Sequence, residues 1–219
     1  MPDDRPRLVL ATANPHKVVE LTRILADSGA RARVVDLSGF PGASDVVETG
    51  ATFADNALLK ARAVAAFTHL PAVADDSGLC ADALNGMPGV LSARWSGRSG
   101  DDAANLMLLL AQLRDVPDDR RGAHFTCAAA LVLPSGREQV SEGILYGSLI
   151  REPRGTKGFG YDPIFVPAGN DRTTAEMSAA QKDSISHRGR ALRALAPVIS
   201  DLLGAQGCGM VHGTEGRPR

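Results

Sequence analysis

Short apolar runs and amphipathic segments alternate along the first part of the chain. Residues 7–12 (RLVLAT) form an apolar run that predicts a first strand. Asn14 followed by Pro15 is typical of a helix start, with Asn14 as the N-cap, and Gly29 favours the end of that helix. The segment between them carries apolar residues at helical spacing, namely Val18, Leu21, Ile24 and Leu25.

Two more strands and a second helix are predicted before the middle of the chain. Residues 33–37 (RVVDL) favour a second strand. Thr52 with Asp55 three residues later resembles a capping box, which predicts a helix over residues 53–67. Residues 71–75 (PAVAD) are apolar up to their last position and predict a short, buried third strand.

The second half begins with loops and continues with a helix and a hairpin. Residues 77–100 are rich in glycine and predict loops, whereas residues 101–114 carry leucines on one side and predict a helix. Residues 124–133 and 139–145 flank a Pro-Ser-Gly turn, which predicts a hairpin. Residues 163–166 predict one more short strand.

The last predicted element is a helix over residues 186–203, with Pro197 as a kink or break. We expect residues 1–204 to form a single domain and residues 205–219, which are rich in glycine and polar groups, to be a disordered tail. The alternation of strands and helices, followed by a hairpin-rich section, predicts an α/β fold with a mixed sheet and the hairpins in a second lobe. Ligands of such sheets usually bind beyond the carboxyl ends of strands.

Composition narrows the classes of function. The formal net charge is −1 and no dense Lys/Arg run occurs, which suits a small ligand in a local pocket better than a nucleic acid. No stretch reaches ~18 apolar residues, so no membrane span is expected, and the polar N-terminus lacks the apolar core of a secretory signal. An odd number of widely spaced cysteines favours a reducing cytoplasm over a disulfide framework, and these are Cys80, Cys127 and Cys208.

Two polar clusters follow predicted strands. Residues 12–17 (TANPHK) join a strand to a helix N-terminus, where free backbone N–H groups and Lys17 would attract a triphosphate. An ordinary N-cap with a surface lysine fits the same residues. Asp75 and Asp76 come after the third strand, and because neighbours in extended chain point to opposite sides, one can face a cleft while the other holds the loop. Carboxylates suit magnesium, with Glu48 as a second acidic candidate, although a turn and a solvated loop explain them equally well.

Two further clusters lie in the second half. Residues 155–162 (GTKGFGYD) combine glycines, which let backbone approach a ligand, with Phe159 and Tyr161, whose rings could face a purine or fill the core. Residues 182–189 (KDSISHRG) place Lys182 and Arg188 where they could neutralise phosphate, and the same residues fit a polar helix start with Ser186 as N-cap.

Five segments together resemble the inosine triphosphate pyrophosphatase family, also described as dITP/XTP pyrophosphatases. They occur in the family's order from Leu8 to about Leu192, and they read LVLATANPHKVVEL, ETGATFADNALLKARA, AVADDSGLCADALNGMPGVLSARWSG, GFGYDPIFVP and EMSAAQKDSISHRGRAL. The resemblance implies an elongated two-lobed fold with a central mixed sheet flanked by helices, the active cleft between the lobes, and a cytoplasmic homodimer. The implied reaction is magnesium-dependent hydrolysis of dITP, ITP and XTP to the monophosphate and pyrophosphate, which cleanses the nucleotide pool.

The resemblance also assigns residues. Asp76 is expected as proton acceptor and Mg²⁺ ligand, with Glu48 as a further ligand, and Asn56 and Lys60 border the cleft as secondary candidates. Ala13 stands where the family commonly has glycine. The substrate-binding residues implied are Thr12, Ala13, Asn14, Pro15, His16, Lys17, Ser77, Phe159, Gly160, Tyr161, Asp162, Lys182, His187 and Arg188.

Base choice follows from hydrogen bonding. Hypoxanthine and xanthine carry a carbonyl at C6, which His187 and Arg188 could contact as donors, whereas the amino group of adenine would leave them unpaired at a cost of about 1–3 kcal/mol each. Three alternatives stay open at this stage: a related pyrophosphatase acting on modified pyrimidine or standard triphosphates, a nucleotide-binding regulatory module without catalysis, and an α/β scaffold in which the clusters are ordinary turns.

Overall fold

The computed structural model describes residues 5–12, 15–29, 32–43 and 46–207. Within these ranges one six-stranded sheet has the strand order β2-β1-β3-β4-β5-β6. β1 pairs in parallel with β2 and β3, and the remaining neighbours are antiparallel, so the predicted mixed sheet is confirmed. The strands are β1 (Arg7–Leu10), β2 (Arg33–Val35), β3 (Ala72–Ala81), β4 (Gly122–Val132), β5 (Glu138–Leu149) and β6 (Phe165–Pro167).

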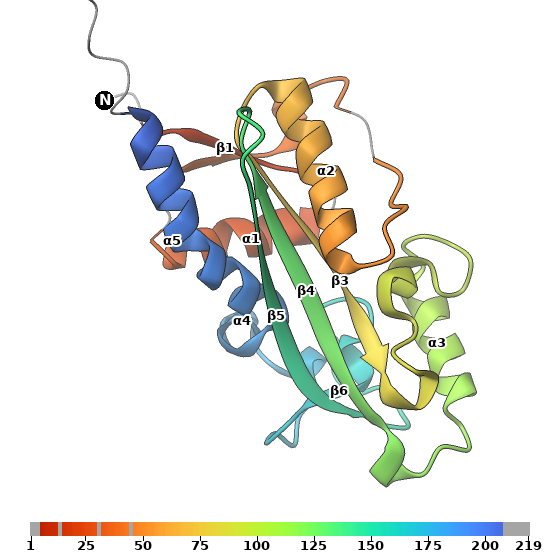
Figure 1. The fold of residues 1–219 in the computed structure, drawn as a ribbon. Coiled ribbons are helices and arrows are strands. Elements are labelled where there is room, and N and C mark those ends of the chain that lie inside the picture. The colour runs from red at the N-terminus through yellow and green to blue at the C-terminus, as the bar shows by residue number, and fades with distance from the viewer. Residues whose placement is uncertain (1–4, 13–14, 30–31, 44–45, 208–219) are drawn as a thin grey trace, which may run out of the picture.

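Helices cover both faces of the sheet, as Figure 1 shows, with α2 on one face and α1 and α5 on the other. Two predicted helix starts are confirmed by their caps. Thr52 and Asp55 form both bonds of the capping box, and the Asp101 side chain accepts from the amide of Ala104. The helices are α1 (Pro15–Asp27), α2 (Phe53–Thr68), α3 (Asp102–Gln112), α4 (Ala179–Ile185) and α5 (His187–Gly207). Among these helices of the described ranges, none has the length and apolar character needed to cross a membrane.

The third strand is longer than predicted. β3 extends to Ala81 because β4 pairs with it antiparallel along its whole length, and the predicted loop beginning at Ser77 is therefore wrong at its start. Asp75 and Asp76 consequently lie inside the strand, opposite Ala129 and Ala128 of β4, and do not follow its end.

The C-terminal segment also differs from the prediction in detail. α4 precedes the predicted final helix and was not predicted, because its polar sequence shows little apolar periodicity. Ser186 separates α4 from α5 and accepts from the amide of Gly189, which confirms it as the N-cap. Pro197 lies inside α5 without ending it, and the helix reaches Gly207, past the expected domain end at residue 204. The rest of the predicted tail, 208–219, lies outside the described residues.

The apolar core consists of three clusters, two of which belong to one lobe and the third to the other. One cluster fills the space between the sheet and α1 and α5, and a second lies beneath α2 on the opposite face. The third packs α3 against the far ends of β3, β4 and β5 and against β6. β3, β4 and β5 run through both lobes, as Figure 1 shows, so they carry side chains into the region between the clusters. The two-lobed arrangement is therefore confirmed, but the prediction that the hairpin forms a second lobe is wrong, because β4 and β5 pair with β3 in the central sheet.

Candidate active site

A cleft of about 1160 Å³ lies where the two lobes meet. Its lining comes from β3, α1, α2, the 3-10 turn at Gly89–Arg94, the loop 158–162 and the α4–α5 junction. The structure brings together at this cleft twelve of the predicted site residues: Thr12, Lys17, Glu48, Asp76, Ser77, Phe159, Gly160, Tyr161, Asp162, Lys182, His187 and Arg188. Ala13 and Asn14 lie outside the described residues, as do the side chains of Pro15 and His16.

Asp76 faces the cleft from the α2 side of β3. Its carboxylate accepts from Asn56 Nδ2 at 3.0 Å and from the backbone amide of Ser77 at 3.0 Å, and Lys60 Nζ lies 3.6 Å away. Burial raises the pKa of Asp76, and the attraction of Lys60 only partly opposes this effect. A carboxyl group with a raised pKa is a better proton acceptor at neutral pH than an ordinary aspartate.

Asp75 points to the opposite face and belongs to a buried ionic network. One oxygen accepts from Lys17 Nζ and from Arg188 Nε, both at 3.1 Å. Arg188 also donates to Glu20 at 2.6 Å and to Ser77 Oγ at 2.8 Å. Burial alone would raise the pKa of Asp75, but the two cations outweigh it and hold that pKa far below its usual range. Asp75 is thus the predicted carboxylate that holds the structure, while Asp76 is the one that faces the cleft.

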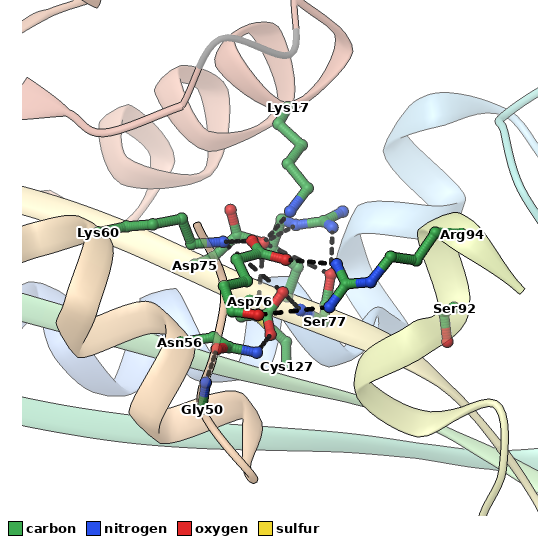
Figure 2. Close-up of polar contacts among 12 residues, drawn as sticks. Lys17, Gly50, Asn56, Lys60, Asp75, Asp76, Ser77, Ser92, Arg94 and Cys127 are labelled. Carbon is green, nitrogen blue, oxygen red and sulfur yellow. Dashed lines mark hydrogen bonds and ion pairs between the residues drawn. The ribbon is translucent and has the colours of Figure 1, made fainter. Parts of the chain in front are cut away.

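Cations from three elements converge on this part of the cleft, as Figure 2 shows for Lys17 of α1, Lys60 of α2 and Arg94. Lys60 Nζ contacts Glu48 Oε1 at 2.6 Å, and Arg94 lies 3.4 Å from the other Glu48 oxygen. Burial would raise the pKa of Glu48, but its contact with Lys60 reverses this and lowers the pKa. Glu48 is therefore a charged neighbour of Asp76, joined to it through the ammonium group of Lys60.

The loop 158–162 forms the other end of the cleft. Asp162 is buried, and its carboxylate accepts from the amide of Phe159 at 2.9 Å and from Lys182 Nζ at 2.5 Å. Lys182 also lies 4.8 Å from the centre of the Phe159 ring. Tyr161 is different, because its ring is buried in the apolar cluster under α3 and its hydroxyl donates to Ser92 O at 2.9 Å. Tyr161 therefore fills the core, whereas Phe159 lines the cleft.

His187 begins α5 and stacks on Phe125, with 4.9 Å between ring centres. Its Nδ1 is buried without a hydrogen-bond partner among the described residues. Burial and the nearby Arg188 and Lys182 hold the pKa of His187 well below its ordinary value, so the ring is neutral at neutral pH. A neutral imidazole can donate from one nitrogen and accept at the other.

Sequence reasoning missed or undervalued four residues of the site. Asn56 and Lys60, ranked as secondary, contact Asp76 directly. Glu20 and Arg94 were not predicted, although Glu20 pairs with Arg188 and Arg94 with Glu48. Glu20 carries a detectable signal, because it lies one helical turn after Lys17 and so shares a helix face with it. Arg94 lies in a glycine-rich stretch without periodicity, and no sequence signal marks it as a site residue.

Comparisons with known proteins identify the family and the fold of this chain. Residues 8–198 match the Ham1 family. A dITP/XTP pyrophosphatase of Streptomyces coelicolor is 61% identical over 198 residues, which cover 90% of this chain and 99% of that protein. The crystal structure of a nucleoside-triphosphatase / dITP/XTP pyrophosphatase from Mycobacterium abscessus is 58% identical, with a TM-score of 0.72 over 87% of this chain and 99% of that one. The structure of a HAM1 protein from Coxiella burnetii is 40% identical, with a TM-score of 0.81 over 90% and 99%.

Proposed function

The chain belongs to the Ham1 family, and we propose that it is a nucleoside triphosphate pyrophosphatase that hydrolyses dITP, ITP and XTP to the monophosphate and pyrophosphate. The activity is that of relatives with which this chain shares more than half of its residues. We further propose that it depends on Mg²⁺ and acts as a cytoplasmic homodimer that removes non-standard purines from the nucleotide pool, as the family resemblance implies.

The observation that carries the proposal is that Asp76 lines one cleft together with the cations Lys17 and Lys60 and the ring of Phe159. The two lysines are suited to the charge of a triphosphate. The ring of Phe159 is suited to stack on a purine. A nucleotide lying along the cleft would have its phosphates near the cations and its base near the ring.

The residues around Lys60 fit a magnesium ion. Asp76 and Glu48 supply hard carboxylate oxygens. The ammonium group of Lys60 lies close to both carboxylates, which shows that this position suits a positive charge. Mg²⁺ usually takes one or two carboxylates together with substrate phosphates and water. The described residues contain no cluster of three or more such ligands, which agrees with a site completed by the substrate. When bound, the ion would neutralise phosphate oxygens and lower the pKa of a bound water.

Asp76 is then the group that moves the proton. Its carboxylate would orient a water molecule towards the α-phosphorus and accept a proton as the oxygen–phosphorus bond forms. The bond from the α-phosphorus to the bridging oxygen breaks, and pyrophosphate leaves with the electron pair. Lys17 lies in the same cleft and would stabilise the negative charge that gathers on the leaving group.

Base selection rests on His187 and on the loop that carries Phe159. Three N–H groups of Arg188 already bind Asp75, Glu20 and Ser77, which leaves His187 as the donor with fewer bonds inside the protein. A donor aimed at C6 favours hypoxanthine and xanthine over adenine.

A panel of nucleoside triphosphates, assayed for pyrophosphate release with and without Mg²⁺, tests the proposal. We expect dITP, ITP and XTP to be hydrolysed with the metal present, and ATP to be hydrolysed far more slowly. A preference for modified pyrimidine or standard triphosphates would replace the substrate class but keep the reaction. Nucleotide binding without pyrophosphate release would indicate a regulatory module and overturn the enzymatic proposal.

A further inference from the structure

A carboxylate of α3 binds the loop 158–162, which packs against the same apolar cluster as α3. Asp102 is the first residue of α3, and its Oδ2 accepts from the backbone amide of Gly160 at 2.7 Å. The two residues are 58 positions apart in the chain and both line the cleft. This hydrogen bond therefore joins two segments of the cleft lining that are far apart in the chain.

The carbonyl of the Phe159–Gly160 peptide already accepts from the amide of Asp162 at 3.3 Å, so the bond from Asp102 fixes the other polar group of that peptide. Gly160 has a φ of +61° and open space where a Cβ would be, so its peptide is free of packing on that side. Its neighbours are held elsewhere, since the Phe159 amide donates to Asp162 and the Tyr161 hydroxyl donates to Ser92 O. The peptide between these anchors carries the N–H that Asp102 captures, and its orientation sets where the Phe159 ring stands.

We propose that Asp102 is a positioning residue for base recognition, which fixes the Gly160 peptide and thereby holds the Phe159 ring where a purine stacks. The inference rests on the proposed function, because it assigns the same cleft a purine nucleotide. Asp102 acts through the loop and has no part in proton transfer. Its loss is therefore expected to weaken binding of the base and to leave the phosphate end unaffected.

A second role for Asp102 must be separated from this one. A carboxylate in the first turn of a helix also interacts favourably with the helix dipole. Asp101 already caps α3, so the helix does not need Asp102 as an N-cap. The two roles differ in what they require, because the dipole responds to negative charge whereas the Gly160 amide requires an acceptor oxygen. Asp102→Asn removes the charge and keeps the acceptor, and Asp102→Ala removes both.

The experiment compares these two variants with the wild type and with Asp115→Ala, which removes an exposed carboxylate just beyond the other end of the same helix. We expect Asp102→Ala to raise the KM for ITP about 5- to 10-fold, the effect of one lost hydrogen bond, with kcat changed less than about twofold. The inhibition constant of inorganic tripolyphosphate, which lacks a base, should stay unchanged. Asp102→Asn and Asp115→Ala should behave as the wild type.

Three results would overturn the inference: an unchanged KM in Asp102→Ala, an equal loss in Asp102→Asn, or weaker inhibition by tripolyphosphate in Asp102→Ala. Melting temperatures recorded in parallel show whether a loss comes from unfolding of the α3 lobe. If the wild type fails to hydrolyse ITP, the proposed function fails on its own account. Calorimetric titration of ITP into the wild type and Asp102→Ala then still measures the effect on binding.

Discussion

Asp75 and Asp76 have different surroundings because successive side chains of β3 point to opposite faces of the sheet. Asp75 meets Lys17 and Arg188 on the α1 and α5 side, and Asp76 meets Asn56 and Lys60 on the α2 side. Burial raises the pKa of both carboxyl groups. At Asp75 the nearby cations outweigh burial and lower the pKa, whereas at Asp76 burial outweighs Lys60 and the pKa is raised. The same change from aspartate to asparagine should therefore affect different properties at the two positions, turnover at Asp76 and stability at Asp75.

Asp76→Asn should reduce turnover of ITP by about 100- to 10,000-fold, the usual contribution of a positioned proton acceptor, and should leave a folded protein. Asp75→Asn should instead lower the free energy of unfolding by about 3 kcal/mol, because it removes a partner of the buried Arg188. Pyrophosphate release and urea denaturation of both variants measure the two effects. Near-normal turnover in Asp76→Asn would remove this residue from the reaction.

The opposite orientations of Asp75 and Asp76 were predictable from the sequence, and their partners were not. Strand alternation alone indicated that one carboxylate faces a cleft and the other supports the structure. Glu20 and Arg188 are 168 positions apart, and only the packing of α1 against α5 brings them together. Tyr161 and Phe159 show the same limit, because composition does not tell which ring fills the core and which faces the cleft.

At the scale of elements, the sequence predicts those whose signals are local. The capping box of α2 and the Pro-Ser-Gly hairpin of β4 and β5 are determined by neighbouring residues, and both are confirmed. The extent of β3 depends on β4, which lies about fifty residues away in sequence, so the strand looked shorter than it is. α4 is short and polar, and it is held by its capping box at Ser178 and its position before α5.

The contact of α5 with β5 gives a prediction at this scale. A Cβ at Gly143 of β5 would lie 2.1 Å from His187 O and 2.7 Å from Ala191 N, which are backbone atoms that cannot turn aside. Gly143→Ala should therefore push the start of α5 away from the sheet and destabilise the protein by about 1–3 kcal/mol. Because His187 and Arg188 begin α5, the KM for ITP should rise as well. Thermal denaturation and initial rates measure these effects.

Gly39→Ala is the matched control for this prediction. An added Cβ at Gly39 meets nothing within 4 Å, so its melting temperature and KM should equal those of the wild type. Equal stability of Gly143→Ala and Gly39→Ala would mean that α5 can shift on β5 without cost.

At the scale of the whole molecule, each lobe has an apolar cluster of its own, and the cleft between them is lined by charged groups that already neutralise one another. Lys60 joins the carboxylates of Glu48 and Asp76, and Lys182 neutralises Asp162. The two-lobed arrangement follows from the family resemblance, whereas this internal balance of charge depends on side-chain positions that no sequence pattern specifies. We therefore expect the two lobes to stay together without a bound cation.

Removal of the metal should consequently abolish turnover and change stability only slightly in the absence of nucleotide. Protein treated with EDTA should release no pyrophosphate from ITP, yet its melting temperature should lie close to that of protein with Mg²⁺, because Lys60 competes with the ion for the two carboxylates and the ion binds weakly until substrate phosphates complete its site.

Lys60→Met keeps the length of the side chain and removes its charge, so Glu48 and Asp76 would then repel each other. Added Mg²⁺ should raise the melting temperature of this variant more than that of the wild type, because linkage stabilises the protein more when the ion binds more tightly. A large loss of stability of the wild type in EDTA would instead show that the ion stabilises the fold. An unchanged melting temperature of Lys60→Met on addition of Mg²⁺ would show that Glu48 and Asp76 do not bind the ion.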